Sequence, residues 1–244
     1  MTALRAAVRL GHAVALAVSG WCTVVFVFPR LTPAECEARV QAWSCRVLSA
    51  LGVELRVSGT PPVAGPLLLV ANHISWLDIL VMHAARHCRF VSKADVRHWP
   101  LIGTMATGAG TLYIERESRR DALRVVHHMA ESLRSGDIVA VFPEGTTSAG
   151  PGVLPFHANL IQAAISADSA VLPVAIDYVD VRGGARSASA SYVDEDTLLS
   201  SLWRTLTGPR IAAVVAFGEP QRRDGRDRRR WAADLRQAVI ALRG

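Results

Sequence analysis

Near the N-terminus lies an uncharged apolar stretch of 20 residues, Leu10–Pro29, with Arg5 and Arg9 before it and Arg30 after it. As an α-helix this stretch would extend about 30 Å, which matches the thickness of a bilayer core. A cleavable signal peptide is the alternative, with Ala17-Val18-Ser19 as the cleavage site, but such a cut would leave an apolar N-terminus. We therefore expect a retained membrane segment, which either spans the bilayer or lies in one leaflet.

A second helix is predicted over Pro33–Leu51. Its apolar positions recur at helical spacing: Val40, Trp43, Val47, Leu48 and Leu51. The stripe fits either a face that packs on the protein core or a face that contacts lipid. Together the two segments predict an apolar helical hairpin over residues 1–58, which serves as a membrane anchor.

After residue 58 the pattern changes to short apolar runs separated by helical or turn segments. The runs are Leu67–Ala71, Phe90–Ser92, Thr111–Ile114, Ile138–Phe142, Val171–Ile176 and Ile211–Phe217. Continuous apolar strands are typical of a sheet that helices cover on both faces. Asp121–Leu133 and Trp231–Leu242 carry helical stripes that suit such covering helices. We therefore predict an α/β domain over residues 59–244, with a mixed, largely parallel sheet.

The composition excludes intrinsic disorder, because 50% of the residues are hydrophobic and 20% are charged. The net charge of +6 suits an anionic membrane, a phosphorylated substrate or nucleic acid. Only 6% of the residues are aromatic and no nucleic-acid-binding motif is present, so we expect no nucleic acid partner. The four cysteines form no CxxC pair, which argues against a disulfide framework and against a zinc site.

A histidine and an aspartate follow the first apolar run, in the segment Asn72-His73-Ile74-Ser75-Trp76-Leu77-Asp78. Ser75 and Asp78 form a capping-box pattern, which predicts the start of a helix. His73 would then precede the helix, so that Asp78 can accept a hydrogen bond from Nδ1 of the ring. Such a carboxylate fixes the tautomer and leaves Nε2 as a general base. Because no serine or cysteine nucleophile accompanies the pair, the pattern indicates a base that activates a substrate hydroxyl directly.

Two other polar groups come at the ends of apolar runs. Arg116 follows Thr111–Ile114 and offers a planar guanidinium suited to phosphate or carboxylate, with an ion pair to a neighbouring acid as the competing explanation. Glu144 follows Ile138–Phe142 and needs a partner, for which Arg116 is a candidate. Gly145, the next residue, permits close approach of the backbone to a ligand.

The segments NHISWLD, GTLYIER, FPEGTTS and VLPVAI follow one another over residues 72–176. In this order they resemble the four sequence blocks of the 1-acyl-sn-glycerol-3-phosphate acyltransferase family of membrane glycerolipid acyltransferases. The resemblance implies transfer of a fatty acyl group from acyl-CoA or acyl-carrier protein to the free hydroxyl of 1-acyl-sn-glycerol 3-phosphate, giving phosphatidic acid. It also implies an α/β fold, no metal and no other cofactor, and a place at the cytoplasmic face of a bacterial inner membrane.

Carried over by position, the resemblance makes His73 the general base and Asp78 its orienting partner. It also implies a set of substrate-binding residues: Asn72, Ser75, Lys93, Arg116, Glu144, Gly145 and Thr146. Lys93, the only lysine in the chain, falls where the family often carries a basic residue near the phosphate of the acceptor.

Two positions depart from the family pattern. Thr147 stands where an arginine is common, which removes one phosphate contact, and Asn159 stands where a glycine is frequent. Because of these two changes, a different acyl acceptor, such as a lyso-ornithine lipid, is the alternative. A further alternative is a membrane thioesterase that uses the same histidine and aspartate to activate water.

Overall fold

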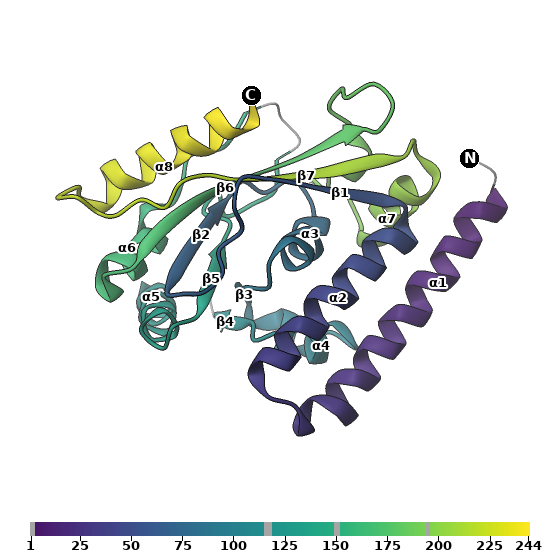
Figure 1. Cartoon of the computed structure of the whole chain (residues 1–244), viewed down its shortest axis with the longest axis horizontal. Coiled ribbons are helices and arrows are strands. Elements are labelled where there is room, and N and C mark those ends of the chain that lie inside the picture. The colour runs from purple at the N-terminus through teal and green to yellow at the C-terminus, as the bar shows by residue number, and fades with distance from the viewer. Residues whose placement is uncertain (1–2, 115–118, 149–151, 194–195) are drawn as a thin grey trace.

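The computed structural model describes residues 3–114, 119–148, 152–193 and 196–244. A seven-stranded sheet of order β1-β7-β6-β2-β5-β3-β4 runs through these residues (Figure 1). The strands are β1 (Val53–Ser58), β2 (Leu67–Ala71), β3 (Arg89–Lys93), β4 (Leu112–Ile114), β5 (Ile138–Val141), β6 (Ala170–Asp180) and β7 (Ile211–Phe217). Neighbouring strands are parallel except β6 and β7, which are antiparallel. The mixed, largely parallel sheet predicted from the apolar runs is confirmed.

Helices connect the strands and cover the sheet. They are α1 (Ala3–Cys22), α2 (Pro33–Leu51), α3 (Leu77–Ala85), α4 (Ile102–Gly108), α5 (Arg119–Arg134), α6 (Ala158–Ala167), α7 (Leu198–Thr207) and α8 (Arg228–Arg243). The helices predicted at α2, α5 and α8 are therefore confirmed.

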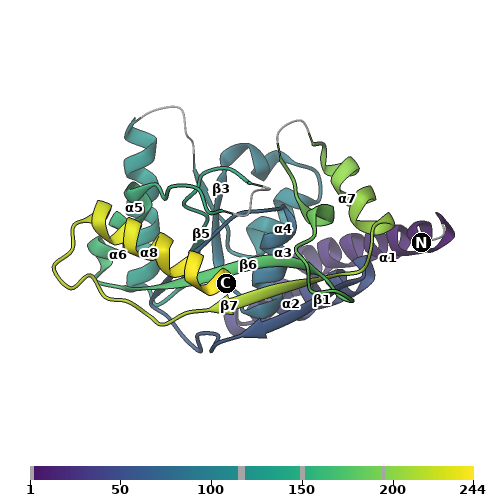
Figure 2. The same cartoon turned by 90° about the horizontal axis from the view of Figure 1, so that it is seen from above.

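The two faces of the sheet carry separate apolar cores, because successive side chains of a strand point to opposite faces. On β2, Leu67 and Leu69 pack in a core with residues of α1, α2 and α3. Leu68 and Val70 face the other way, into a core with α5, α6 and α8. Figure 2 shows these two helical layers on either side of the strands. Both faces are buried, which explains why the strands are continuous apolar runs.

Strand β1 was not predicted, although its sequence alternates apolar and polar residues. Val53 is buried, whereas the strand becomes exposed toward Ser58, because β1 is an edge strand that pairs with β7 alone. The strand lies before residue 59, where we placed the start of the α/β domain, and it nevertheless belongs to the sheet. The predicted boundary at residue 58 between a membrane-associated hairpin and the α/β domain thus stays a prediction, and it concerns only the two helices that come before β1.

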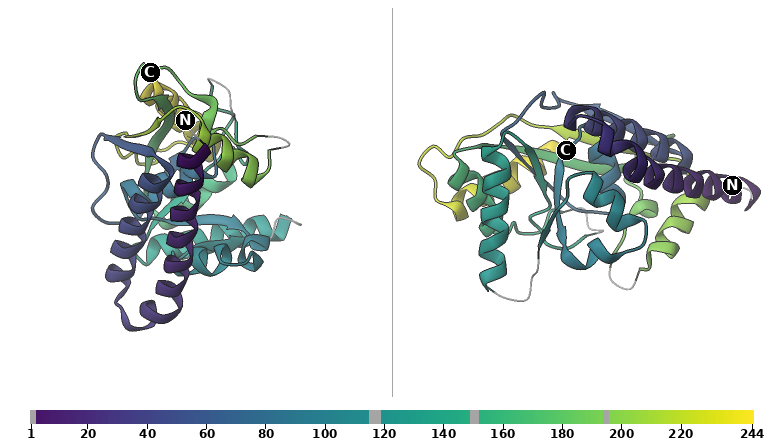
Figure 3. Two further views of the ribbon diagram at one scale, coloured as in Figure 1. Left: turned by 90° about the vertical axis from the view of Figure 1, so that its right-hand side faces the viewer. Right: turned by 90° about the horizontal axis from the view of Figure 1, so that it is seen from below.

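The N-terminal hairpin consists of α1 and α2, which lie antiparallel beside the sheet (Figure 3). α1 continues through a π-helical turn and a 3-10 turn to Arg30, and the helix Leu4–Arg30 is long and apolar enough to cross a membrane. Thr32 and Glu35 then form a capping box that starts α2. Val47, Leu48 and Leu51 of the apolar stripe of α2 are buried in the core with α3 and the sheet, so this part of the stripe faces the protein core.

The packing of α2 predicts that it contributes to the stability of the whole domain. Leu48 is only 1% exposed, and Leu48→Ala should lower the free energy of unfolding by about 2–5 kcal/mol because a cavity replaces the side chain. Urea unfolding of the detergent-solubilised chain measures this change. Leu123→Ala, at an exposed position on α5, is the control and should change stability little. Equal effects of the two substitutions would mean that α2 is only an anchor.

Candidate active site

The candidate site lies where two adjacent parallel strands, β2 and β5, reach their carboxyl ends. The chain leaves β2 at Asn72 and His73, and it leaves β5 at Phe142, Pro143 and Glu144. The His73 N–H donates to Glu144 Oε1 over 2.7 Å, and the Ser148 N–H donates to the His73 carbonyl over 2.9 Å. The first and third sequence blocks are therefore joined through hydrogen bonds to the backbone of His73.

His73 and Asp78 are in direct contact. Nδ1 of His73 lies 2.8 Å from Asp78 Oδ2, and His73 precedes α3 while Asp78 is in its first turn, as expected, although the N-cap residue is Trp76 and the predicted capping box is only half formed. The same oxygen accepts from the N–H groups of Ile74 and Ser75, at 2.7 and 2.9 Å. The hydroxyl of Ser75 accepts from the Leu77 N–H. These local bonds set the turn that brings the ring and the carboxylate together.

The other oxygen of Asp78 is bound by a residue that the sequence did not point to. Tyr178 on β6 donates its hydroxyl to Asp78 Oδ1 over 2.7 Å, and both side chains are buried. Burial, together with the charge of Asp78 and the hydrogen bond to it, holds the pKa of Tyr178 well above its usual range. The phenol thus remains a donor. Leu172, Val174 and Ile176 are alternate residues of β6 that point into the same core, and Tyr178 is the next in this series. This alternation is the one local feature of the sequence that could have indicated a buried Tyr178.

The ring of His73 is held in one orientation but remains accessible. It stacks on Phe142 with ring centroids 4.0 Å apart and an interplanar angle of 5°. Phe142 in turn stacks on Phe90 of β3. The side chain of His73 is 20% exposed, whereas that of Asp78 is fully buried. Nδ1 is occupied by the carboxylate, so Nε2 is the ring nitrogen left for a reacting group.

Glu144 connects two backbone segments. Its Oε1 accepts from the His73 N–H, and its Oε2 accepts from the Leu154 N–H over 2.8 Å. Burial raises the pKa of Glu144, while the two N–H donors oppose that shift. Its partners are therefore backbone groups, and the candidate partner Arg116 lies outside the described residues.

Asn72 and Ser75 were expected to bind substrate, but both are buried against protein groups. The amide of Asn72 donates to the Ile176 carbonyl and accepts from the Ile176 N–H, at 2.9 and 2.8 Å. These bonds tie the end of β2 to β6. Ser75 is likewise fully buried, at the start of α3. Both side chains thus help to hold the turn that carries His73, and the substrate contact expected from the sequence stays a prediction.

The remaining predicted site residues lie nearer the surface. Lys93 is exposed at the carboxyl end of β3. Gly145 has a positive φ of 75°, and a Cβ there would lie 3.0 Å from the ring of His157, so glycine suits this turn. Thr146 is exposed on the same turn, and Thr147 is half-buried beside it.

Comparison with known proteins agrees with this fold. Residues 54–177 match the acyltransferase family. A lyso-ornithine lipid O-acyltransferase of Pseudomonas aeruginosa is 40% identical over 99% of this chain and 93% of its own length. A 1-acyl-sn-glycerol-3-phosphate acyltransferase of Neisseria meningitidis serogroup B is 42% identical over 70% of this chain and 67% of its own length.

The fold is also found in a solved structure. The crystal structure of the 1-acyl-sn-glycerophosphate acyltransferase from Thermotoga maritima superposes with a TM-score of 0.67, at 19% identity, over 96% of this chain and 95% of the other. The chain therefore belongs to the acyltransferase family that includes the 1-acyl-sn-glycerol-3-phosphate acyltransferases. It is an acyltransferase whose relatives act on lysolipids.

The contact between Tyr178 and Asp78 predicts the effect of removing one hydroxyl. Tyr178→Phe should lower the free energy of unfolding by about 1.5–3 kcal/mol, because a buried carboxylate oxygen loses its donor. Thermal or urea unfolding measures the change. Tyr192→Phe is the matched control, because it removes the same hydroxyl from a half-buried tyrosine near the site. Tyr192 contacts the site through its backbone N–H, which donates to the Ile74 carbonyl and is kept in the variant. Equal stability of the two variants would contradict the importance of this hydrogen bond.

Proposed function

We propose that this acyltransferase moves a fatty acyl group from acyl-CoA or acyl-carrier protein to the free hydroxyl of 1-acyl-sn-glycerol 3-phosphate, giving phosphatidic acid. The observation that carries the proposal is the contact of 2.8 Å between Nδ1 of His73 and the buried carboxylate of Asp78. It leaves Nε2 of an oriented, partly exposed imidazole as the base.

The reaction follows from this arrangement as a single displacement. Nε2 of His73 takes the proton of the acceptor hydroxyl while the hydroxyl oxygen attacks the carbonyl carbon of the thioester. The new C–O bond forms, the C–S bond breaks, and the thiolate leaves with the proton that His73 held. Asp78 stabilises the imidazolium during this transfer, because Nδ1 donates to its carboxylate. No acyl-enzyme is formed.

A second acceptor, a lyso-ornithine lipid, is favoured by two observations. Thr147 replaces an arginine that is common in the third block, which removes one group suited to a phosphate. The relative from Pseudomonas aeruginosa, which matches this chain over nearly its whole length, is a lyso-ornithine lipid O-acyltransferase. His73 would remove a proton from a hydroxyl in both acceptors, so selection between the two head groups depends on the residues around the site.

The test is an acyl-transfer assay with the purified full-length protein. Labelled acyl-CoA and acyl-carrier protein are each offered with lysophosphatidic acid or lyso-ornithine lipid. His73→Ala should reduce the rate about 10²- to 10⁴-fold while the protein stays folded, because general-base catalysis is lost. His127→Ala, at an exposed histidine on α5, is the matched control and should leave the rate unchanged.

The same assay separates the alternatives. Near-normal turnover by a folded His73→Ala protein would overturn the role of His73. Label that moves only into ornithine lipid would keep the mechanism and replace the acceptor. Thioester cleavage at the same rate without any lysolipid would show hydrolysis in place of acyl transfer.

The position of α1 supports attachment to one leaflet of a membrane, which we place at the cytoplasmic face of a bacterial inner membrane. Along its length α1 packs against α2, α4 and α7, so protein covers one side of it. Phe26, in the π-helical turn after α1, is exposed, and the opposite side of α1 itself carries four large exposed apolar residues: Leu4, Val8, Val14 and Val18. These positions fall on one face of a helix with 3.6 residues per turn, which suits a helix that lies in the interface plane.

This arrangement predicts that a charge on the exposed face of α1 weakens membrane association. Val18 is 47% exposed, and Val18→Arg should move a large part of the expressed protein from the membrane fraction to the soluble fraction. Leu123→Arg places the same charge on exposed α5, on the other side of the sheet, and should leave the distribution unchanged. Fractionation and immunoblotting measure both. An unchanged Val18→Arg protein would contradict attachment through this face.

A further inference from the structure

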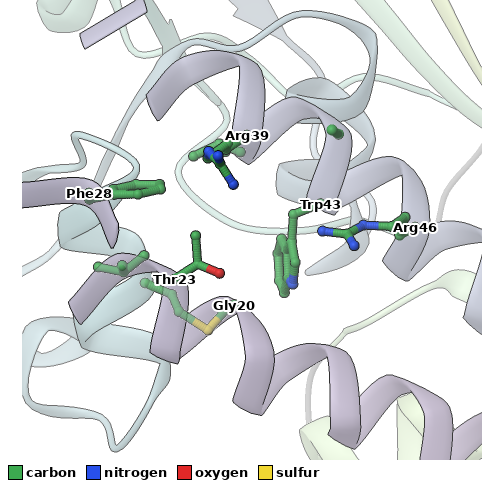
Figure 4. A pocket seen from close by; sticks show the side chains of 10 residues that line it. Gly20, Thr23, Phe28, Arg39, Trp43 and Arg46 are labelled. Atoms are coloured by element: carbon green, nitrogen blue, oxygen red, sulfur yellow. The ribbon is translucent and has the colours of Figure 1, made fainter. Parts of the chain in front are cut away.

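A cavity of about 180 Å³ opens between the two helices of the N-terminal hairpin (Figure 4). Its apolar lining comes from α1 and the turn after it, from α2, and from α4: Gly20, Val24, Phe28, Val40, Trp43 and Met105. None of these residues belongs to the site around His73. The cavity therefore needs an explanation of its own.

The cavity is held open by the way the two helices meet. Trp43 of α2 donates its indole N–H to the Leu16 carbonyl of α1 over 2.8 Å, which fixes the ring between the helices. At Gly20 the two helices are so close that a Cβ would lie 2.6 Å from the indole nitrogen. This contact sets the separation of the helices, so the space beside Trp43 is preformed.

Two arginines line the cavity. Arg39 and Arg46 lie two turns apart on α2, on either side of Trp43, and Figure 4 shows both guanidinium groups turned toward the cavity. Both side chains are exposed, and within the described part of the chain neither forms an ion pair. Glu35, one turn before Arg39, is bound by Thr32 instead. The cavity thus combines an apolar lining with two available guanidinium groups.

We infer that this cavity binds one anionic glycerophospholipid of the membrane, apart from the substrates of the reaction. A guanidinium group matches the oxygen atoms of a phosphate, and two of them suit a phosphodiester with a net negative charge. The apolar lining takes part of one acyl chain. Because 180 Å³ is less than a whole drug-sized ligand fills, the remainder of the lipid stays in the bilayer.

The surroundings of the cavity favour a lipid over a free phosphate ion. Val24 and Phe28 belong to the same apolar segment as Val18 and Phe26, which are exposed on the side that we place in the membrane. The cavity therefore lies where acyl chains and phosphate groups of a leaflet meet. A free phosphate would use the arginines but leave the apolar lining without an occupant.

The test measures lipid binding by the full-length protein in detergent. The purified, delipidated chain is titrated with dioleoylphosphatidylglycerol, dioleoylphosphatidylcholine or glycerol 3-phosphate, and bound lipid is counted by native mass spectrometry. We expect one tightly bound phosphatidylglycerol, weaker phosphatidylcholine, and no retained glycerol 3-phosphate. The double variant Arg39→Gln/Arg46→Gln should bind phosphatidylglycerol at least about tenfold more weakly, because two charged hydrogen-bond donors are lost.

Control variants separate this site from general surface charge. Arg56→Gln/Arg210→Gln removes two exposed arginines, one on β1 and one directly before β7, and should bind phosphatidylglycerol like the unaltered protein. Ala42→Phe, at an exposed position that lines the cavity, should fill the space and weaken lipid binding without a change of charge. His73→Ala should keep the bound lipid, since the reaction is not involved.

Three outcomes would overturn the inference. Equal loss of lipid in the two double-arginine variants would show that net charge alone attracts lipid. Equal retention of phosphatidylcholine and phosphatidylglycerol would show that the arginines do not select a head group. Unaltered binding by Ala42→Phe would show that the lipid lies elsewhere on the hairpin. Because binding is measured without turnover, these results do not depend on which acyl acceptor the enzyme uses.

Discussion

The carboxylate of Asp78 is the group on which the arrangement of this site depends. It is fully buried, where an ionised carboxylate is stable only if hydrogen-bond donors surround it. Four donors do so: Nδ1 of His73, the N–H groups of Ile74 and Ser75, and the hydroxyl of Tyr178. Because the buried carboxylate needs these donors, it fixes the turn before α3, the orientation of the imidazole and the contact between that turn and β6. The same four hydrogen bonds thus satisfy the buried carboxylate and orient the proposed base.

The parallel sheet brings the rest of the site to the same place. β2 and β5 are neighbours, so the residues that follow them emerge side by side at their carboxyl ends. Glu144 accepts from the backbone of His73, and Phe142 stacks on its ring. The base is thus held through its backbone, its ring face and its Nδ1 atom, while Nε2 remains for the substrate. A site built on strand ends and a helix start is more rigid than one built on a long loop.

Helix α2 belongs to two parts of the molecule at once. Its inner face packs in the core with α3 and the sheet, and its outer face pairs with α1 around Trp43. The exposed apolar face of α1 is therefore attached rigidly to the domain that carries His73. With α1 in the leaflet where we propose it lies, this attachment keeps the site at a constant height above the lipid, which suits acyl transfer to a lysolipid. The cavity beside Trp43 is a consequence of the same helix pairing.

The sequence by itself determined the elements whose signals are local. Buried strands appear as apolar runs, and the segment from His73 to Asp78, with the helix start predicted at Ser75, covers only six consecutive positions, so both can be recognised without coordinates. Long-range contacts have no such signature. Tyr178 reaches Asp78 across 100 positions, and Glu144 reaches the backbone of His73 across 71. Only the tertiary structure decided these partners, because the order of strands in a sheet, not the spacing of residues along the chain, sets which side chains meet. The same holds for the edge strand β1, whose pairing partner β7 comes last among the strands.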